Sequence, residues 1–224
     1  MNVLVTGASR GIGLELVRQL AARGDHVHAA ARDPKSKSLA AISGIKAHAL
    51  DVGSDESVAA LVRELDGHPL DLVINNAGIY GGDKQSLRGV DFAEAAQVFN
   101  TNTLGALRVS LALLPNLRKG QGKKLIHVSS GMGSIEDNGS GGAYAYRMSK
   151  AALNMMSKGL AVDLKGEKIL SAVINPGWVQ TDMGGSGASI KVEESAKGIL
   201  REIDKATLAD TGAFLDYKGG RLTW

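Results

Sequence analysis

Short apolar runs alternate with segments of helical periodicity along the whole chain, and this alternation limits the possible folds more than any other feature. Each apolar run is typical of a buried strand, and each ends in small or polar residues. Strands that alternate with helices in this way indicate an α/β fold with a doubly wound parallel sheet, whose ligands bind beyond the carboxyl ends of the strands. We expect about seven strands, with helices on both faces of the sheet.

The boundaries of these elements follow from the same pattern. Strands are predicted at Asn2–Val5, His26–Ala31, Ile45–Leu50, Leu70–Ile74, Lys124–Val128, Ile169–Ile174 and Gly212–Tyr217. Helices are predicted over Leu14–Leu20, from Ser54 to about Leu65, from Asp91 to about Leu114, from Tyr144 to about Leu164, and from Val192 to about Lys205. No linker, internal repeat or low-complexity segment divides the chain, so residues 1–224 are expected to form a single domain.

Composition excludes several classes of protein. The 224 residues include no cysteine, so disulfides and thiolate metal sites are impossible. His26 and His28 alternate on a strand, but no third ligand accompanies them, and no metal is expected. Aromatic residues make up only 4% of the chain, and the net charge is +3, without the interleaved basic and aromatic residues that bind nucleic acid.

The chain also shows no apolar run long enough to cross a membrane. Its first strand begins at the N-terminal Met1, which leaves no room for a signal peptide. We therefore expect a cytoplasmic protein with no membrane or nucleic-acid partner.

The segment Thr6–Gly13 lies between the first strand and the first helix and contains three glycines. Gly7 is suited to a tight turn, Gly11 to a close approach of the backbone to a pyrophosphate, and Gly13 to close packing of helix against strand. Their spacing is Gly-x-x-x-Gly-x-Gly, which differs from the usual dinucleotide fingerprint. This segment nevertheless predicts a phosphate-binding turn.

Basic residues favour NADP(H) over NAD(H). The end of the second strand faces the adenosine ribose in a dinucleotide-binding fold, and an arginine there accommodates a 2′-phosphate. Arg32 occupies this position and Arg10 lies in the glycine segment, so two guanidinium groups could bind the phosphate. Asp33 leaves NAD(H) open, since a shift of one residue would bring a carboxylate to the ribose.

Tyr146 and Lys150 are four residues apart and therefore share one face of the predicted helix. A phenol has a pKa of about 10, and an ammonium about 4 Å away could lower that pKa by up to about three pH units before the cost of desolvation is subtracted. Such a pair would make Tyr146 a general acid and base. Tyr144 lacks this partner, because Met148 stands four residues after it.

Six motifs occur together in an order that resembles the short-chain dehydrogenase/reductase family. They are Thr6–Gly13, Asn75–Gly78, Asn102, Ser130, Tyr146 with Lys150, and Pro176–Gly177. The segments Arg32–Pro34, Ser129–Ile135, Ala145–Lys150 and Gly177–Met183 resemble the C-factor and sniffer type of carbonyl reductase. The resemblance covers essentially the whole chain and implies a Rossmann-type fold.

The resemblance implies a hydride transfer between NADP(H) and a carbonyl or alcohol substrate, with four catalytic residues. Tyr146 would donate the proton to the carbonyl oxygen, Lys150 would lower the tyrosine pKa and hold the nicotinamide ribose, and Ser130 would hydrogen-bond the same oxygen. Asn102 would hold a water that links Lys150 to solvent. Ser130 is preferred to the adjacent Ser129 on the family pattern alone.

The resemblance also implies the cofactor contacts and the substrate loop. Asp51 and Val52 would meet the adenine, while Thr181 and the backbone of Val179 would hold the carboxamide. The full cofactor set is Gly7, Ser9, Arg10, Gly11, Ile12, Gly13, Arg32, Asp51, Val52, Asn75, Ala77, Gly78, Tyr146, Lys150, Pro176, Gly177, Val179 and Thr181. The glycine-serine stretch within residues 184–191 is expected to be a flexible substrate loop that closes over the cofactor.

Relatives of this type often pair through the helices that carry Asn102 and Tyr146, so a homo-oligomer is expected. An alternative function stays open, because the C-factor resemblance includes proteins associated with developmental signalling. Under that alternative, the chain is a dinucleotide-bound signalling or binding protein without physiologically important turnover.

Overall fold

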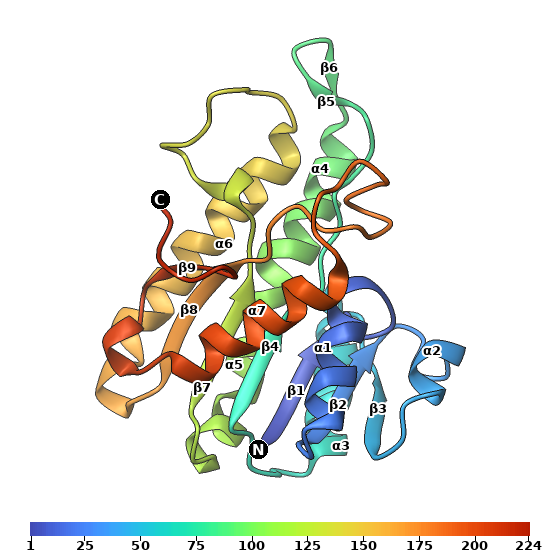
Figure 1. Cartoon of the computed structure of the whole chain (residues 1–224), viewed down its shortest axis with the longest axis vertical. Helices are drawn as coiled ribbons and strands as arrows, with labels where there is room; N and C mark the ends of the chain where they lie inside the picture. The colour runs from blue at the N-terminus through green and yellow to red at the C-terminus, as the bar shows by residue number, and fades with distance from the viewer.

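A seven-stranded parallel sheet forms the centre of the molecule in the computed structural model, which describes all 224 residues (Figure 1). The strands lie in the order β3-β2-β1-β4-β7-β8-β9, and every neighbouring pair is parallel. Their bounds are β1 (Asn2–Thr6), β2 (His26–Ala31), β3 (Ile45–Ala49), β4 (Leu72–Asn75), β7 (Lys124–Val128), β8 (Leu170–Asn175) and β9 (Phe214–Asp216). The predicted doubly wound sheet is therefore confirmed.

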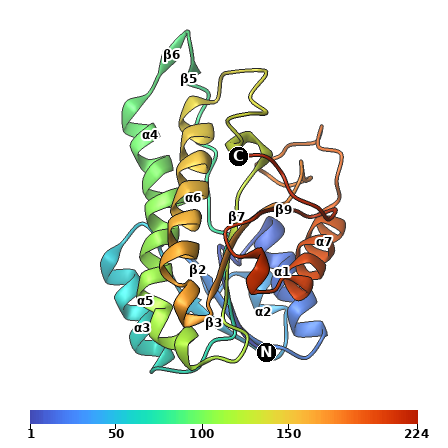
Figure 2. The same cartoon turned by 90° about the vertical axis from the view of Figure 1, so that its left-hand side faces the viewer.

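Helices cover both faces of this sheet (Figure 2). One face carries α1 and α7, and the other carries α3, α5 and α6. The helices are α1 (Gly11–Ala22), α2 (Lys37–Ala40), α3 (Asp55–Leu65), α4 (Phe92–Phe99), α5 (Gly105–Lys119), α6 (Tyr144–Asp163) and α7 (Val192–Lys205). The chain leaves β1 toward β2 and β3, then returns to β4 on the other side of β1, which creates a switch point between β1 and β4.

Two-sided burial explains why the strands are apolar runs. In β1, Val3 and Val5 belong to the larger core beneath α1 and α7, whereas Leu4 belongs to the second core beneath α3 and α5. All three side chains are fully buried. Side chains alternate between the two faces of a strand, so a strand covered on both sides must be apolar at successive positions.

The predicted helix from Asp91 to about Leu114 is interrupted in the structure. It consists of α4, a π-helical turn at Asn100–Leu104, and α5, which continues through Pro115 to Lys119. The side chain of Asp91 caps α4 by accepting from the Glu94 N–H at 3.0 Å. The chain continues as a helix beyond Pro115 because Leu113 and Leu117 on either side are completely buried.

Besides three short 3₁₀ turns, two small elements were not predicted. They are the single-turn helix α2 and a hairpin of β5 (Gln85–Ser86) with β6 (Gly89–Val90), which projects beyond the main sheet next to α4 (Figure 1). Both are too short for hydrophobic periodicity to reveal.

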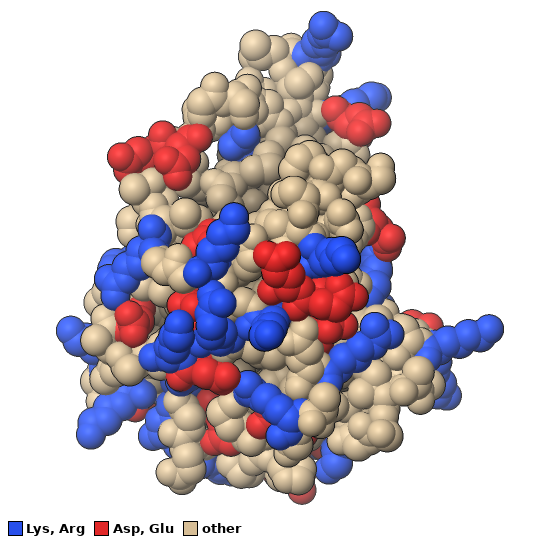
Figure 3. All heavy atoms as spheres, in the orientation of Figure 1, with Lys and Arg blue, Asp and Glu red and all other residues tan.

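Positive and negative side chains are interspersed on the face that includes α7 (Figure 3). Arg23 pairs with Asp204 at 2.9 Å, and Arg201 pairs with Glu202 at 2.7 Å. Exposed pairs of this kind contribute little to stability. None of the helices combines the length and the apolar character that crossing a membrane requires.

Candidate active site

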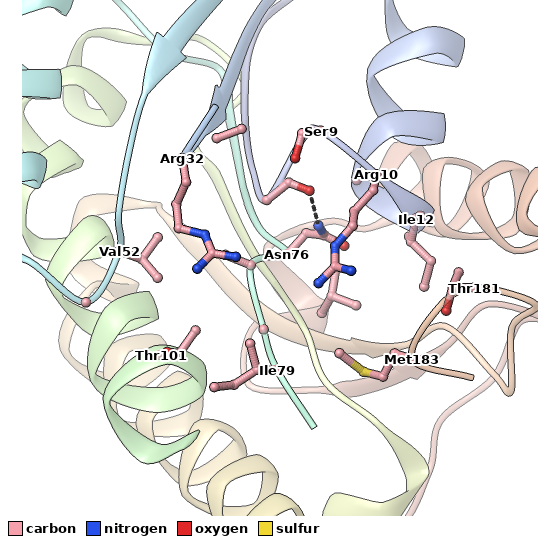
Figure 4. A pocket seen from close by; sticks show the side chains of 18 of the residues that line it. Ser9, Arg10, Ile12, Arg32, Val52, Asn76, Ile79, Thr101, Thr181 and Met183 are labelled. Carbon is pink, nitrogen blue, oxygen red and sulfur yellow. Dashed lines mark hydrogen bonds between the residues drawn. The ribbon is translucent and has the colours of Figure 1, made fainter. Parts of the chain in front are cut away.

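A cavity of about 410 Å³ opens at the carboxyl ends of the strands, at the switch point between β1 and β4 (Figure 4). This is the position at which doubly wound sheets bind their ligands. Fifteen of the residues expected to bind the cofactor line it: Gly7, Ser9, Arg10, Gly11, Ile12, Gly13, Arg32, Asp51, Val52, Ala77, Gly78, Tyr146, Lys150, Pro176 and Thr181.

The glycine turn has the geometry that its spacing predicts. Gly7 has a φ of +66°, and a methyl group there would lie 2.8 Å from the Ala77 Cα. A methyl group on Gly13 would overlap the carbonyl oxygen of Gly7, so only glycine lets α1 approach β1 this closely. The start of α1 thereby faces the cavity with its unpaired N–H groups, an arrangement suited to a phosphate.

Two arginines project into the cavity from opposite sides, as Figure 4 shows for Arg10 and Arg32. Arg10 also pairs with Asp182 at 2.9 Å, but both side chains are largely exposed, which makes this a weak interaction. Asp33 accepts a local hydrogen bond from the Lys35 N–H at 3.0 Å and does not line the cavity. Two guanidinium groups therefore make this part of the cavity lining positive.

Asn75 does not face the cavity, and its predicted cofactor contact requires correction. Its side chain is buried on the other side of β4, where Nδ2 donates to Ser110 Oγ at 3.0 Å and contacts His127 Nδ1 at 3.2 Å. The following residue, Asn76, lines the cavity instead. Side chains along an extended chain alternate in direction, so a shift of one residue places the side chain on the opposite face.

Two further predicted cofactor residues lie outside the cavity lining. Gly177 forms a turn with a φ of +79° and packs against Tyr217, and the buried Val179 forms an isolated bridge with Ile190. Their neighbours Pro176 and Thr181 do line the cavity.

Tyr146 lies in the first turn of α6 and lines the same cavity as the glycine turn. Burial raises the pKa of its phenol to about 12, a hydrogen bond with Ser130 acts in the opposite direction, and Tyr80 adds to the increase. The side chain of Ser129 donates instead to Asn154 Oδ1 at 2.6 Å. The pKa of the phenol therefore responds to Ser130, although Ser129 and not Ser130 is among the residues that line the cavity.

Lys150 lies one turn further along α6 and is 5% exposed. Its ammonium donates to the Val128 carbonyl oxygen at 2.8 Å and lies 5.8 Å from the centre of the Tyr146 ring. Burial lowers the pKa of Lys150 to about 8.

The pKa of Tyr146 is raised in this structure rather than lowered, because burial has the larger effect. The phenol pKa moves upward, because the loss of water around the ring outweighs the interactions that favour the phenolate. The ammonium of Lys150 is directed to a backbone carbonyl. At neutral pH the pair is therefore a protonated phenol beside a buried cation.

Asn102 sits in the π-helical turn between α4 and α5 and is completely buried. Its Oδ1 accepts from the Ile79 N–H at 2.8 Å, and its Nδ2 donates to the Ile79 carbonyl oxygen at 2.9 Å and to Ser149 Oγ at 3.0 Å. A methyl group on Gly78 would lie 3.3 Å from Asn102 Oδ1 and 3.7 Å from Lys150 Nζ. Both polar groups therefore lie close to Gly78.

Residues that line the cavity but were not predicted come mostly from strand ends and from α4 and its π-helical turn. They are Ala31, Leu50, Gly53, Asn76, Ile79, Gln97, Asn100, Thr101, Val128, Ser129, Asp182 and Met183. Those at strand ends could have been found, because they adjoin predicted residues. Gln97, Asn100 and Thr101 carry no such signal, since only the packing of α4 brings them to the cavity.

The segment of residues 184–191 forms hydrogen bonds with the residues just before it. The Gly184 N–H donates to Thr181 Oγ1 at 3.2 Å, and Gln180 Nε2 donates to the Ala188 carbonyl oxygen at 2.9 Å. Met183 at its start lines the cavity. The flexibility expected of this segment stays a prediction.

Comparisons with known proteins agree with this geometry. The family model described as short chain dehydrogenase matches residues 1–189. The C-signal protein of Myxococcus xanthus is 47% identical over 156 residues, which cover 70% of this chain and 93% of that protein.

The solved structures that resemble the whole chain include two carbonyl reductases. The NADPH-bound carbonyl reductase from chicken fatty liver has a TM-score of 0.90 at 34% identity, covering 100% of this chain and 98% of that one. The carbonyl reductase Sniffer of D. melanogaster has a TM-score of 0.91 at 33% identity, covering 100% and 99%. The chain therefore belongs to the short-chain dehydrogenase/reductase family of oxidoreductases, and within it to the carbonyl reductase type.

Proposed function

We propose that this protein is an NADP(H)-dependent carbonyl reductase in which Tyr146 acts as general acid and base. The main support is that the Tyr146 phenol, hydrogen-bonded with Ser130, borders the same cavity as the glycine turn. A phosphate-binding turn and a proton donor thus share one cavity.

A protonated phenol is the form needed to reduce a carbonyl group. With a pKa of about 12, Tyr146 keeps its proton at neutral pH and can donate it to a carbonyl oxygen. The nicotinamide, when bound, supplies the hydride for the carbonyl carbon, so the product is an alcohol. Ser130 holds the same oxygen, and the buried Lys150 cation stabilises the phenolate that remains after proton transfer.

Lys150 and Asn102 would return a proton to Tyr146 after it has donated its own. Both side chains lie close to Gly78, and the Lys150 pKa of about 8 allows this group to release a proton near neutral pH. Asn102 would orient a water between Lys150 and solvent. In the alcohol-oxidising direction the same groups would carry the proton the other way.

Arg10 and Arg32 support NADP(H) as the cofactor. The two guanidinium groups fit the 2′-phosphate of NADP(H) in charge, and the glycine turn fits a pyrophosphate. The chicken carbonyl reductase that the chain resembles is described as NADPH-bound.

Substitution of Arg32 tests this choice of cofactor. Removing a charge-assisted contact to phosphate costs about 1.5–3 kcal/mol, so Arg32→Ala should weaken NADPH binding by about 10- to 100-fold. NADH binding, measured in the same fluorescence titration, should change little. An unchanged ratio of the two dissociation constants would contradict the assignment of Arg32.

Substitution of Tyr146 tests the reaction itself. Tyr146→Phe removes only the hydroxyl and should lower the rate of NADPH oxidation with aldehydes, ketones and diketones by about 10²- to 10⁴-fold. Tyr144→Phe is the matched control, because this neighbouring phenol is absent from the cavity lining. Equal rates for Tyr146→Phe and the parent protein would refute the assignment, provided that both bind NADPH equally.

The similarity to C-signal motivates one other function, that of a dinucleotide-bound signalling protein. The buried Tyr146 and Lys150 favour turnover, because ionisable groups with shifted pKa values reduce stability unless they serve a purpose. Rescue of a cellular phenotype by Tyr146→Phe as fully as by the parent would favour signalling.

We also propose that two copies associate through α5 and α6. Along α6, Met148, Met155 and Val162 recur every seven residues and are 49%, 73% and 68% exposed. Leu104 and Leu111 have the same spacing on the adjoining helix and are 49% and 51% exposed. The helices lie side by side (Figure 2), so these side chains give α5 and α6 an apolar surface suited to a symmetric interface.

A further inference from the structure

The side chain of Gln85 connects two parts of the chain that meet at the candidate active site. It is 5% exposed and uses both ends of its carboxamide. Its Oε1 accepts from the Tyr146 N–H at 3.0 Å, while its Nε2 donates to the carbonyl oxygens of Tyr80 at 3.0 Å and Gly82 at 2.8 Å. Every hydrogen bond is to backbone, so these contacts position backbone rather than side chains.

The first contact compensates for a missing cap on α6. The residue before this helix, Ala143, has a φ of +45° and a side chain that cannot accept a hydrogen bond. N–H groups in the first turn of a helix have no partner within the helix. Gln85 supplies a partner for the Tyr146 N–H from a distant part of the chain, and thereby holds the backbone of the proposed general acid.

The other two contacts hold the segment that carries Tyr80. The preceding residue, Ile79, is bound through both its N–H and its carbonyl group to Asn102, and Gln85 binds the carbonyl of Tyr80 itself. The backbone on both sides of the Tyr80 ring is therefore restrained by buried side chains.

This arrangement places two phenol rings together. The ring centres of Tyr80 and Tyr146 are 4.9 Å apart, and the ring planes are inclined by 39°. Tyr80 remains 38% exposed, whereas Tyr146 is 8% exposed. Tyr146 lines the cavity that suits the cofactor, but Tyr80 does not. A substrate that brings its carbonyl oxygen to the Tyr146 hydroxyl can therefore contact the exposed part of the Tyr80 ring.

We propose that Gln85 is a positioning residue that holds the Tyr80 and Tyr146 rings as a pair, and that Tyr80 is a specificity-determining residue of the substrate site. This inference rests on the proposed carbonyl reductase function. It extends that function, because neither residue belongs to the motifs that identify the family.

Four variants test the inference: Gln85→Met, Tyr80→Ala, Tyr80→Phe, and Gln85→Met combined with Tyr80→Ala. Gln85→Met keeps the length of the side chain and removes its three hydrogen bonds. Each variant is assayed with NADPH and two aldehydes, one with an aromatic ring on the carbonyl carbon and one with a short alkyl group. The NADPH dissociation constant and the urea midpoint establish that each variant is folded.

Tyr80→Ala should raise KM for the aromatic aldehyde by about 2- to 10-fold, because the contact between two aromatic rings contributes a binding energy of that size. KM for the alkyl aldehyde should change little. Tyr80→Phe keeps the ring and should keep the parental ratio of the two KM values. Gln85→Met should raise the same KM and also lower kcat for both aldehydes, because Tyr146 loses its backbone partner. In the Tyr80→Ala background, Gln85→Met should affect kcat alone.

Parental KM and kcat values in Gln85→Met and Tyr80→Ala would overturn the inference, even if Tyr146→Phe abolished turnover and the proposed function stood. If Gln85→Met does not fold, Gln85→Glu replaces it. Glutamate keeps an acceptor for the Tyr146 N–H but, when ionised, cannot donate to Tyr80, so KM for the aromatic aldehyde should rise while kcat falls less.

A structural measurement tests the pairing when no aldehyde is turned over. In protein labelled at tyrosine, nuclear Overhauser contacts between the Tyr80 and Tyr146 rings should be present in the parent and weakened in Gln85→Met. Contacts of undiminished strength in that variant would show that Gln85 does not hold the pair. Absence of turnover in the parent would count against the proposed function alone.

Discussion

Replacement of Lys150 by methionine should make the protein more stable while removing the proposed activity. Methionine has a similar length and no charge. The lysine is buried among the residues that border the cavity, and burial lowers its pKa from an ordinary value of 10.5 to about 8. At neutral pH the folded protein therefore carries a cation that would be more favourable in the unfolded chain.

The size of the effect follows from the two pKa values. A difference of about 2.5 pH units corresponds to about 3 kcal/mol of destabilisation at pH 7. Removing the ammonium also leaves the Val128 carbonyl oxygen without its partner, which costs about 1–2 kcal/mol. Lys150→Met should therefore gain about 1–2 kcal/mol of unfolding free energy at pH 7, or about 2–8 °C in Tm.

The sign of the pH dependence gives a second test. Between pH 8 and 10.5 the unfolded lysine binds more protons than the folded one, so the parent becomes more stable as pH rises through this range. The advantage of Lys150→Met should consequently be smaller by about 2 kcal/mol at pH 9.5 than at pH 7. Urea unfolding at both pH values measures this difference.

Lys158→Met is the control, because Lys158 is an exposed lysine of the same helix. It should show no such change between the two pH values. The reasoning is refuted if Lys150→Met is less stable than the parent at pH 7, or if its stability difference from the parent does not vary with pH.

Two further predictions concern the glycine turn and the proposed interface. Gly13→Ala should lower the unfolding free energy by about 1–3 kcal/mol and weaken NADPH binding, because its methyl group would overlap the Gly7 carbonyl oxygen. Gly159→Ala is the control, since nothing lies within 4 Å of a methyl group at this α6 position. In the same urea and NADPH titrations it should be neutral or slightly stabilising. Met155→Glu should shift the protein from dimer to monomer in sedimentation equilibrium. In a dimer, two copies of the new carboxylate would face the apolar surface of α5 and α6. A dimer that persists would contradict the proposed interface.

Local patterns were sufficient for the features that depend on neighbouring residues. Glycine spacing in Thr6–Gly13 predicted the turn because positive φ angles and close backbone approach are properties of single residues. The four-residue interval between Tyr146 and Lys150 predicted a shared face of α6 because helix geometry sets that interval. The resemblance of these motifs to a known family supplied the roles that spacing alone does not define.

The π-helical turn at Asn100–Leu104 is a feature that local sequence patterns did not predict. Its sequence is compatible with an uninterrupted helix, and the wider turn depends on contacts that Asn102 makes with Ile79 and Ser149. Local patterns also did not show that Asn76, rather than Asn75, lines the cavity, because this depends on where β4 ends relative to its neighbours.

The sequence by itself determined the alternating α/β architecture, the phosphate-binding turn and the identity of the tyrosine and lysine, because each is encoded by residues close together in the chain. Only the tertiary structure decided that Tyr146 has a raised rather than a lowered pKa, and that Gln85 and Tyr80 lie against it. The physical reason is that desolvation, and hydrogen bonds between residues 61 positions apart, depend on how elements pack, which no local pattern specifies.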